Sequence, residues 1–126
     1  LTRWLPLQAE IMPANFVEMS VELVAERGIK SGDKVTVTSA RSQVDAVAIV
    51  TKRFKPFQVA GATVHQVGLP WHFGWATTRE HDVMANGIPY SNPTYGDAAN
   101  LLTPSIGDAN TMIPETKAFM VNVEKK

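Results

Sequence analysis

The 126-residue chain contains no cysteine, which excludes a disulfide framework, a thiolate nucleophile and any cysteine-ligated zinc or iron–sulfur site within it. It also lacks an excess of either charge, with 12 basic and 12 acidic side chains. Nucleic acids and anionic membranes both favour a basic surface, so neither is expected as a partner. No apolar run approaches the roughly 20 residues of a spanning helix, and we expect no direct membrane insertion.

The length predicts a single domain, residues 1–126, that is large enough to bury a hydrophobic core. Residues 1–15 are expected to form an irregular arm, because prolines interrupt their apolar side chains, and this arm should pack on the domain or on a preceding one. A short helix is predicted at Val21–Arg27. Ser20 is its candidate N-cap, and Gly28 occupies the position that favours a left-handed C-cap.

Short segments of alternating apolar side chains predict a mainly β architecture with little helix. Residues 16–69 are expected to supply the strands of a barrel. Within them, 34–39 and 44–50 should form a hairpin, and 57–69 should hold one or two more strands. Residues 117–123 are predicted to close the domain as a strand, with its apolar side chains on one face.

Residues 68–116 have a different character, with five of the eight glycines, five of the eight prolines and almost no hydrophobic periodicity. Their tryptophans and tyrosines would be costly to leave in water, which argues against disorder. A long ordered segment without regular structure is usually functional. We therefore expect these residues to form loops wrapped around a ligand or a partner, with Arg79 as their only lysine or arginine.

An aromatic cluster, Gly68-Leu-Pro-Trp-His-Phe-Gly-Trp75, begins this segment. The ring of His72 can donate and accept hydrogen bonds, which suits a phosphate or the edge of a heterocyclic ring, and Gly74 would let the backbone approach a ligand closely. The cluster is equally compatible with a packed aromatic corner in which the histidine is satisfied internally. Composition alone leaves both interpretations open.

The residues offer no pattern for catalysis or for a metal. His65, His72 and His81 have spacings that match no compact ligand motif. Ser91 and Ser105 lie in predicted loops, and neither lies in a Gly-x-Ser-x-Gly elbow. We therefore assign no catalytic residue and no metal ligand to the chain.

Three polar groups in the last third remain candidates for binding or for structure. Asp97 is expected to cap a short helix at 98–102, with a role as a base the alternative. Residues 108–111 should form an Asx-type turn whose free amides face an anion. Glu115 and Lys117 are close in sequence and are typical of a surface ion pair of little energetic weight.

Several of these loop motifs resemble one family. They are Gly68-Leu-Pro-Trp-His-Phe-Gly-Trp75, Ala99-Asn-Leu-Leu-Thr-Pro104 and Gly107-Asp-Ala-Asn-Thr111 followed by Pro114-Glu115 and Lys117-Ala-Phe119. Together they resemble the C-terminal molybdopterin-dinucleotide-binding domain of molybdenum- or tungsten-dependent formate dehydrogenase catalytic (alpha) subunits, within the dimethyl sulfoxide reductase superfamily. Residues 16–20 and 28–35 resemble the pattern of the superfamily as a whole.

The resemblance implies a double-psi β-barrel with one or two short helices and long ligand-wrapping loops. It also implies binding of the bis-(molybdopterin guanine dinucleotide) cofactor, with the molybdenum or tungsten, the catalytic residues and the iron–sulfur ligands held by upstream domains. Together with the polar inventory of the loops, it gives the candidate cofactor-binding residues His72, Gly74, Trp75, Asn100, Thr103, Asp108, Asn110, Thr111, Glu115 and Lys117.

The partners that the resemblance implies are the upstream domains of the same catalytic subunit and an iron–sulfur electron-transfer subunit. The compartment is periplasmic or cytoplasmic, with the periplasm slightly favoured. Two alternatives remain: a double-psi barrel that serves as a protein-interaction module, and the same cofactor domain from another molybdenum oxidoreductase or a formylmethanofuran dehydrogenase. The long loop system at 68–116 favours the cofactor domain over the interaction module.

Overall fold

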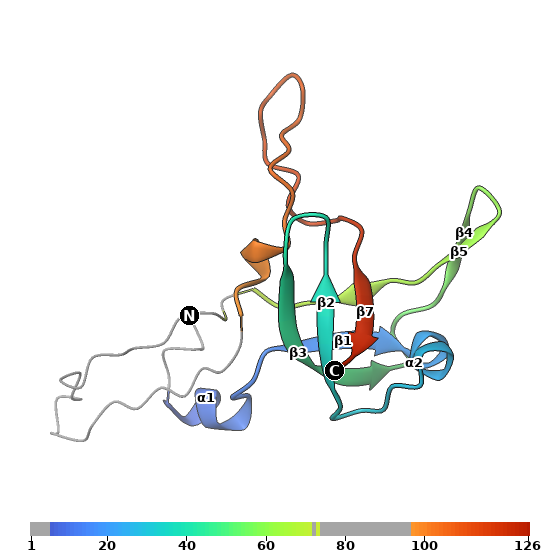
Figure 1. Cartoon of the computed structure of the whole chain (residues 1–126). Helices are drawn as coiled ribbons and strands as arrows, with labels where there is room; N and C mark the ends of the chain where they lie inside the picture. Colours follow the sequence, from blue (N-terminus) through green and yellow to red (C-terminus); the bar gives the residue numbers. More distant parts are fainter. Residues whose placement is uncertain (1–5, 72, 74–96) are drawn as a thin grey trace, which may run out of the picture.

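A computed structural model describes residues 6–71, 73 and 97–126 of the chain (Figure 1). The cofactor-binding predictions for His72, Gly74 and Trp75 lie outside these residues. Most of the described elements are short strands. In chain order they are α1 (Pro6–Ile11), β1 (Phe16–Ser20), α2 (Val21–Arg27), β2 (Lys34–Thr38), β3 (Gln43–Thr51), β4 (Phe57–Val59), β5 (Ala62–Val64), β6 (Val67–Gly68), the 3-10 helix η2 (Ala99–Leu101) and β7 (Asn122–Lys125).

Five strands form one sheet in the order β6-β1-β3-β2-β7, and β4 and β5 pair separately. The sheet curls like half of a barrel, so that β1 runs across behind β2 and β7 (Figure 1). β1 pairs with β3 in parallel, whereas the other pairs in the sheet are antiparallel. The predicted mainly β fold class is therefore confirmed, and the double-psi connection stays a prediction.

The predicted helix and both of its caps are confirmed in α2. The hydroxyl of Ser20 accepts a hydrogen bond from the backbone N–H of Leu23 at 3.1 Å, which satisfies one of the unpaired donors of the first turn. Gly28 ends the helix with φ of 63°, in the left-handed conformation that a residue without a Cβ adopts at little cost. Ile29 follows, and its side chain is buried in the hydrophobic core.

β2 and β3 form the predicted hairpin, with Val37 opposite Val44 in the ladder. Alternate side chains of β2 point inward, so Val35 and Val37 are buried while Lys34 is exposed. This two-residue period places the apolar face of the hairpin on the inside of the curl. There it joins a core from β1, α2, β3 and β7, made of Val17, Met19, Leu23, Val24, Ile29, Val35, Val37, Val44, Ala46, Ala48, Leu102 and Val123.

Residues 57–69 contain three short strands, β4, β5 and β6, rather than the one or two expected. Gly61 has φ of 81° in the tight turn between β4 and β5. This hairpin projects from the sheet (Figure 1), and Phe57 and Val59 are about half exposed on it. The extra strand arises because the turn at Gly61 doubles the chain back before it rejoins the main sheet as β6.

The prediction of a closing strand at 117–123 is wrong in its bounds, because β7 spans Asn122–Lys125. Pairing with β2 sets these limits, since β2 offers partners from Val35 to Thr38. The expected inward face holds: Val123 is buried, and Phe119 and Val121 pack against the core. The arm predicted to be irregular at 1–15 contains the short helix α1.

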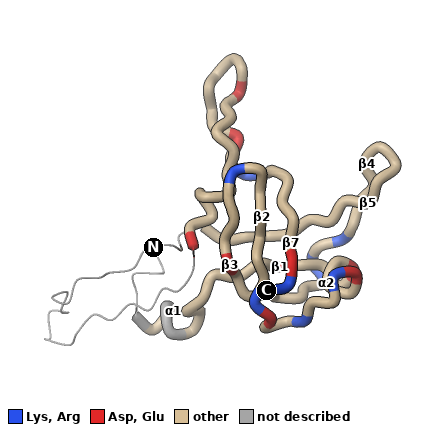
Figure 2. Tube along the Cα trace, in the orientation of Figure 1, with Lys and Arg blue, Asp and Glu red and all other residues tan. Residues whose placement is uncertain are grey.

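Charged residues gather at the sheet end that holds the C-terminus of β7 and near α2, whereas the projecting 104–116 loop has acidic but no basic residues (Figure 2). Lys125 pairs with Asp33 at 2.8 Å, and Lys126 pairs with Asp45. These two pairs tie the end of β7 to the preceding strands. In the described part of the chain, no helix is long and apolar enough to cross a membrane.

Candidate functional site

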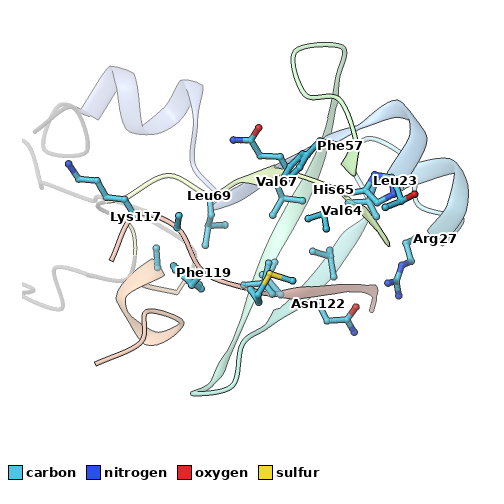
Figure 3. Close-up of a pocket in the computed structure, with 18 of the residues that line it drawn as sticks. Leu23, Arg27, Phe57, Val64, His65, Val67, Leu69, Lys117, Phe119 and Asn122 are labelled. Carbon is cyan, nitrogen blue, oxygen red and sulfur yellow. The ribbon is translucent and has the colours of Figure 1, made fainter. Parts of the chain in front are cut away.

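A cavity of about 870 Å³ lies on the inner side of the curled sheet, between β5 and β6 on one side and the chain leading into β7 on the other. Leu69 and Phe119 lie opposite each other across it (Figure 3). Its two ends are polar. His65 and Arg27 lie at one end, and Lys117 lies at the other. A half-open apolar cavity with a few polar groups is typical of a ligand site.

A second cavity, of about 500 Å³, shares part of this wall. Trp71 and Lys117 line both cavities, and Phe73 and Asn100 line the second one. The structure therefore brings together Asn100 and Lys117, two of the predicted cofactor-binding residues, beside two aromatic rings of the predicted cluster. An aromatic face, a carboxamide and an ammonium group are complementary to a heterocyclic ring and a phosphate.

Segment 97–103 carries Asn100 and is tied to the sheet at its start. The carboxylate of Asp97 accepts a hydrogen bond from the backbone N–H of Asp45 in β3 at 3.0 Å. Its carbonyl accepts another, also at 3.0 Å, from the side-chain amide of the buried Asn15. The prediction that Asp97 caps a helix is wrong, because η2 begins after Ala98 without a side-chain cap. Asp97 fastens the segment to β3 instead.

The end of segment 97–103 is held by Arg41, from the turn between β2 and β3. Its Nη1 donates to the carbonyls of Thr103 at 2.9 Å and Asn100 at 3.2 Å. The hydroxyl of Thr103 donates to the same Asn100 carbonyl at 3.0 Å, and the Thr103 side chain is buried. The structure thus places Thr103, a predicted cofactor-binding residue, inside the segment as a brace for the neighbouring backbone.

The loop that follows carries the predicted Asx-type turn, which is confirmed. One oxygen of Asp108 accepts from the backbone N–H of Thr111 at 2.8 Å, from its hydroxyl at 2.8 Å and from the N–H of Asn110 at 3.0 Å. These bonds, those from Thr111 above all, hold the pKa of the Asp108 carboxyl below its usual value. The expectation of free amides is wrong here, because the amides of Asn110 and Thr111 already bind this carboxylate.

The turn lies apart from the two cavities. Gly107 and Pro114 form an antiparallel bridge at the base of the loop, which projects beyond the sheet (Figure 1). The predicted binding residues Asp108, Asn110 and Thr111 are on this projection and line neither cavity. Glu115, another predicted binding residue, donates its backbone N–H to Ile106 at 2.9 Å. Among the described ion pairs, none joins Glu115 to Lys117, so the expected surface pair is not formed.

Sequence reasoning missed a polar contact at the other end of the larger cavity. His65 Nε2 lies 3.1 Å from the carboxylate of Glu26 in α2, and His65 Nδ1 is buried without a hydrogen-bond partner. The residues are 39 positions apart, and no local sequence signal links them. Within residues 6–71, 73 and 97–126, no three side chains of the metal-binding types gather.

The fold and the cavities define the class as a small, mainly β ligand-binding domain. The Molydopterin dinucleotide binding domain family matches residues 2–120 of the sequence. The chain belongs to this family.

Three relatives of the chain are formate dehydrogenase subunits. The chain is 54% identical over 125 residues to formate dehydrogenase subunit alpha of Megalodesulfovibrio gigas, covering 99% of the chain and 11% of the relative. It is 45% identical over 124 residues to formate dehydrogenase 2 subunit alpha (cytochrome c-553) of Nitratidesulfovibrio vulgaris, covering 98% and 11%. It is 45% identical over 119 residues to the nitrate-inducible formate dehydrogenase major subunit of Escherichia coli K12, covering 94% and 10%. The chain thus spans about a tenth of the length of these relatives.

Proposed function

We propose that this chain binds the bis-(molybdopterin guanine dinucleotide) cofactor as the C-terminal domain of a formate dehydrogenase alpha subunit. The family match over residues 2–120 supports a pterin dinucleotide as the ligand. The observation that carries the proposal is the meeting of Asn100 and Lys117 with Trp71 and Phe73 around one cavity.

The residues at this cavity fit such a group. A pterin and a guanine each present a flat ring with donors and acceptors on its edge, and the dinucleotide carries phosphates. The rings of Trp71 and Phe73 would pack against a heterocycle, and the carboxamide of Asn100 would pair with its edge. Lys117 would hold a phosphate, because its ammonium is exposed at the cavity and pairs with no acid in the described part of the chain.

The predicted residues outside this cavity have different roles in the proposal. Thr103 would fix the backbone beside Asn100, and Asp108 would fix the loop at 107–114. Asn110, Thr111 and Glu115 would reach the cofactor from that loop. His72, Gly74 and Trp75 remain predicted ligands from the aromatic cluster.

The whole protein would oxidise formate to carbon dioxide. Its bound cofactor supplies the redox chemistry through a molybdenum or tungsten ion held by upstream domains, while this domain would bind and orient the organic part. The names of the relatives support this activity. We further propose contacts with the upstream domains, an iron–sulfur subunit as electron partner, and a periplasmic location.

The test uses the complete protein that carries this chain, purified with its cofactor. Pterin dinucleotide and metal are measured per mole of protein, together with formate-dependent dye reduction. We expect a loaded wild-type protein, and Asn100→Ala and Lys117→Ala variants that each retain about tenfold less cofactor after dilution, since a lost charged or buried hydrogen bond costs about 1–3 kcal/mol.

The matched control is Lys52→Ala, which removes an exposed lysine outside both cavities. It should leave cofactor content and activity unchanged. A wild-type protein without pterin dinucleotide would refute the function. A loaded wild type with fully loaded Asn100→Ala and Lys117→Ala variants would refute the site.

A further inference from the structure

We propose that Arg41 is a positioning residue for the cofactor, which acts by fixing the backbone that presents Asn100 to the second cavity. This inference rests on the proposed function. Arg41 lines neither cavity. Its influence on a ligand must therefore pass through the residues that it binds.

The turn between β2 and β3 holds Arg41 in place before any ligand arrives. Ser39 Oγ accepts from the backbone N–H of Arg41 at 3.1 Å and from that of Ser42 at 3.3 Å. The backbone N–H of Ser39 also donates to the Ser42 carbonyl at 2.8 Å. These hydrogen bonds fix the backbone of the turn, and the backbone of Arg41 is therefore held in place relative to the sheet.

The guanidinium then bridges two carbonyls of a segment far away in the sequence. Its Nη1 donates to Asn100 and Thr103, which follow Arg41 by 59 and 62 positions. Carbonyls at the end of a short helix lack partners within it, and they attract a cation. Arg41 thus adds a second donor to the Asn100 carbonyl, which also accepts from the Thr103 hydroxyl, and it ties the Thr103 carbonyl to the turn between β2 and β3.

The backbone carbonyl of Asn100 is held by hydrogen bonds, and the same residue is part of the cavity wall. Its backbone carbonyl faces the guanidinium of Arg41 and the hydroxyl of Thr103, while the residue also lines the second cavity. The preceding Ala99 is buried, which limits rotation of the segment. A fixed carbonyl on one side leaves the carboxamide in a narrow range of positions on the other, and such preorganisation strengthens binding.

The experiment measures how fast the cofactor leaves the complete protein after dilution, through the fluorescence of the oxidised pterin. Arg41→Ala should release it about tenfold faster than wild type, because charge-assisted hydrogen bonds to the carbonyls are lost. Arg41→Lys should fall between them, since an ammonium lacks the planar fork of arginine. The control Arg53→Ala removes another exposed arginine, one that pairs with Glu18, and should release at the wild-type rate.

A double-variant cycle distinguishes positioning from general stabilisation. Asn100→Ala removes the carboxamide but keeps the carbonyl that Arg41 binds. If Arg41 acts through that carboxamide, Arg41→Ala adds little in the Asn100→Ala background, and the double variant also releases cofactor about tenfold faster. If the two substitutions acted independently, their effects would multiply, and the double variant would release the cofactor about a hundredfold faster than the wild type.

The possible results lead to different conclusions. Suppose that the wild-type protein carries its cofactor but Arg41→Ala releases it at the wild-type rate, or that the two substitutions multiply their effects on the release rate. Either result overturns the inference about Arg41 and leaves the proposed function standing. A wild-type protein that carries no pterin dinucleotide overturns the proposed function and this inference together.

Discussion

The ring of Phe73 meets the ring of Phe16 edge-on, with centroids 6.4 Å apart and planes at 82° to each other. Phe73 belongs to the aromatic cluster before the long loops, and Phe16 begins β1. The geometry is a favourable arrangement for two aromatic quadrupoles. Part of the cluster is therefore the packed aromatic corner that composition left as one of two interpretations, and it fastens the start of the loops to the sheet.

Replacing Phe73 by alanine should lower the free energy of unfolding by about 3–5 kcal/mol, because it removes a buried ring and leaves a cavity beside Phe16. Urea denaturation of the purified chain measures the change. Phe57→Ala is the control, since that ring is 49% exposed on the β4–β5 hairpin and should cost much less. Equal losses for the two variants would contradict the assigned packing.

The N-cap of α2 offers a sharper test on a single hydrogen bond. Ser20→Ala leaves the backbone N–H of Leu23 without its partner in a buried position, and we expect a loss of about 1 kcal/mol. Thermal unfolding followed by circular dichroism measures it. The matched change Ser105→Ala concerns an exposed hydroxyl in the loop and should leave the midpoint unchanged. A Ser20→Ala variant as stable as the wild type would argue against the cap.

The core and the site should respond differently to truncation. Val35→Ala removes two buried methyl groups from the inner face of β2, outside both cavities, and should cost roughly 2 kcal/mol of stability, with a normal cofactor release rate once the protein is folded. Asn100→Ala should do the reverse, with normal stability and faster release. Unfolding and release are measured on the same preparations. If each variant changed both the free energy of unfolding and the cofactor release rate, the separation between core residues and site residues would be contradicted.

The loop at 107–114 should open in acid. Hydrogen bonds from Thr111 and Asn110 favour the charged form of Asp108, so the pKa of Asp108 lies below its ordinary value of 3.8. A group with a lowered pKa stabilises the folded form above that ordinary value, and this contribution disappears as the pH falls through the lowered pKa. The Thr111 amide resonance should report this transition in a nuclear magnetic resonance titration.

Asp108→Asn provides the comparison for this titration, because its amide oxygen still accepts a hydrogen bond but does not titrate. Its Thr111 amide should show no transition at the same acidic pH. A carboxyl at Asp108 that titrates at 3.8 or above would show that the turn does not favour the charged form.

The elements that the sequence predicted correctly are those with local causes. The helix α2 follows from Ser20 and Gly28 at its two ends, and both caps act within one turn of the chain. The β2–β3 hairpin follows from the alternation in Val35 and Val37 and from a four-residue turn. The Asx turn at Asp108 is likewise contained within three residues.

The failures concern partners that are distant in the sequence. The local sequence predicts that Asp97 caps a helix. In the structure its carboxylate instead accepts a hydrogen bond from the backbone N–H of Asp45 in β3, 52 positions away. The start of β7 depends on where β2 can pair, and this cannot be read from the apolar run at 117–123. Two residues of the predicted site, Asn100 and Lys117, come together because the segment held by Arg41 lies beside the chain leading into β7. The local sequence contains no signal that predicts this contact.

The pairing of β7 with β2 has a consequence for how the domain forms. Lys125 pairs with Asp33, just before β2, across 92 positions, and among the paired strands of the described sheet β2 and β7 are the partners farthest apart in the sequence. Loop closure over such a distance is slow compared with the formation of a hairpin. On a ribosome, β2 and β3 would emerge and pair long before β7 is synthesised. During that interval β2 exposes an unpaired edge next to Val35 and Val37, and the nascent chain is open to strand exchange with a neighbour until its last strand arrives.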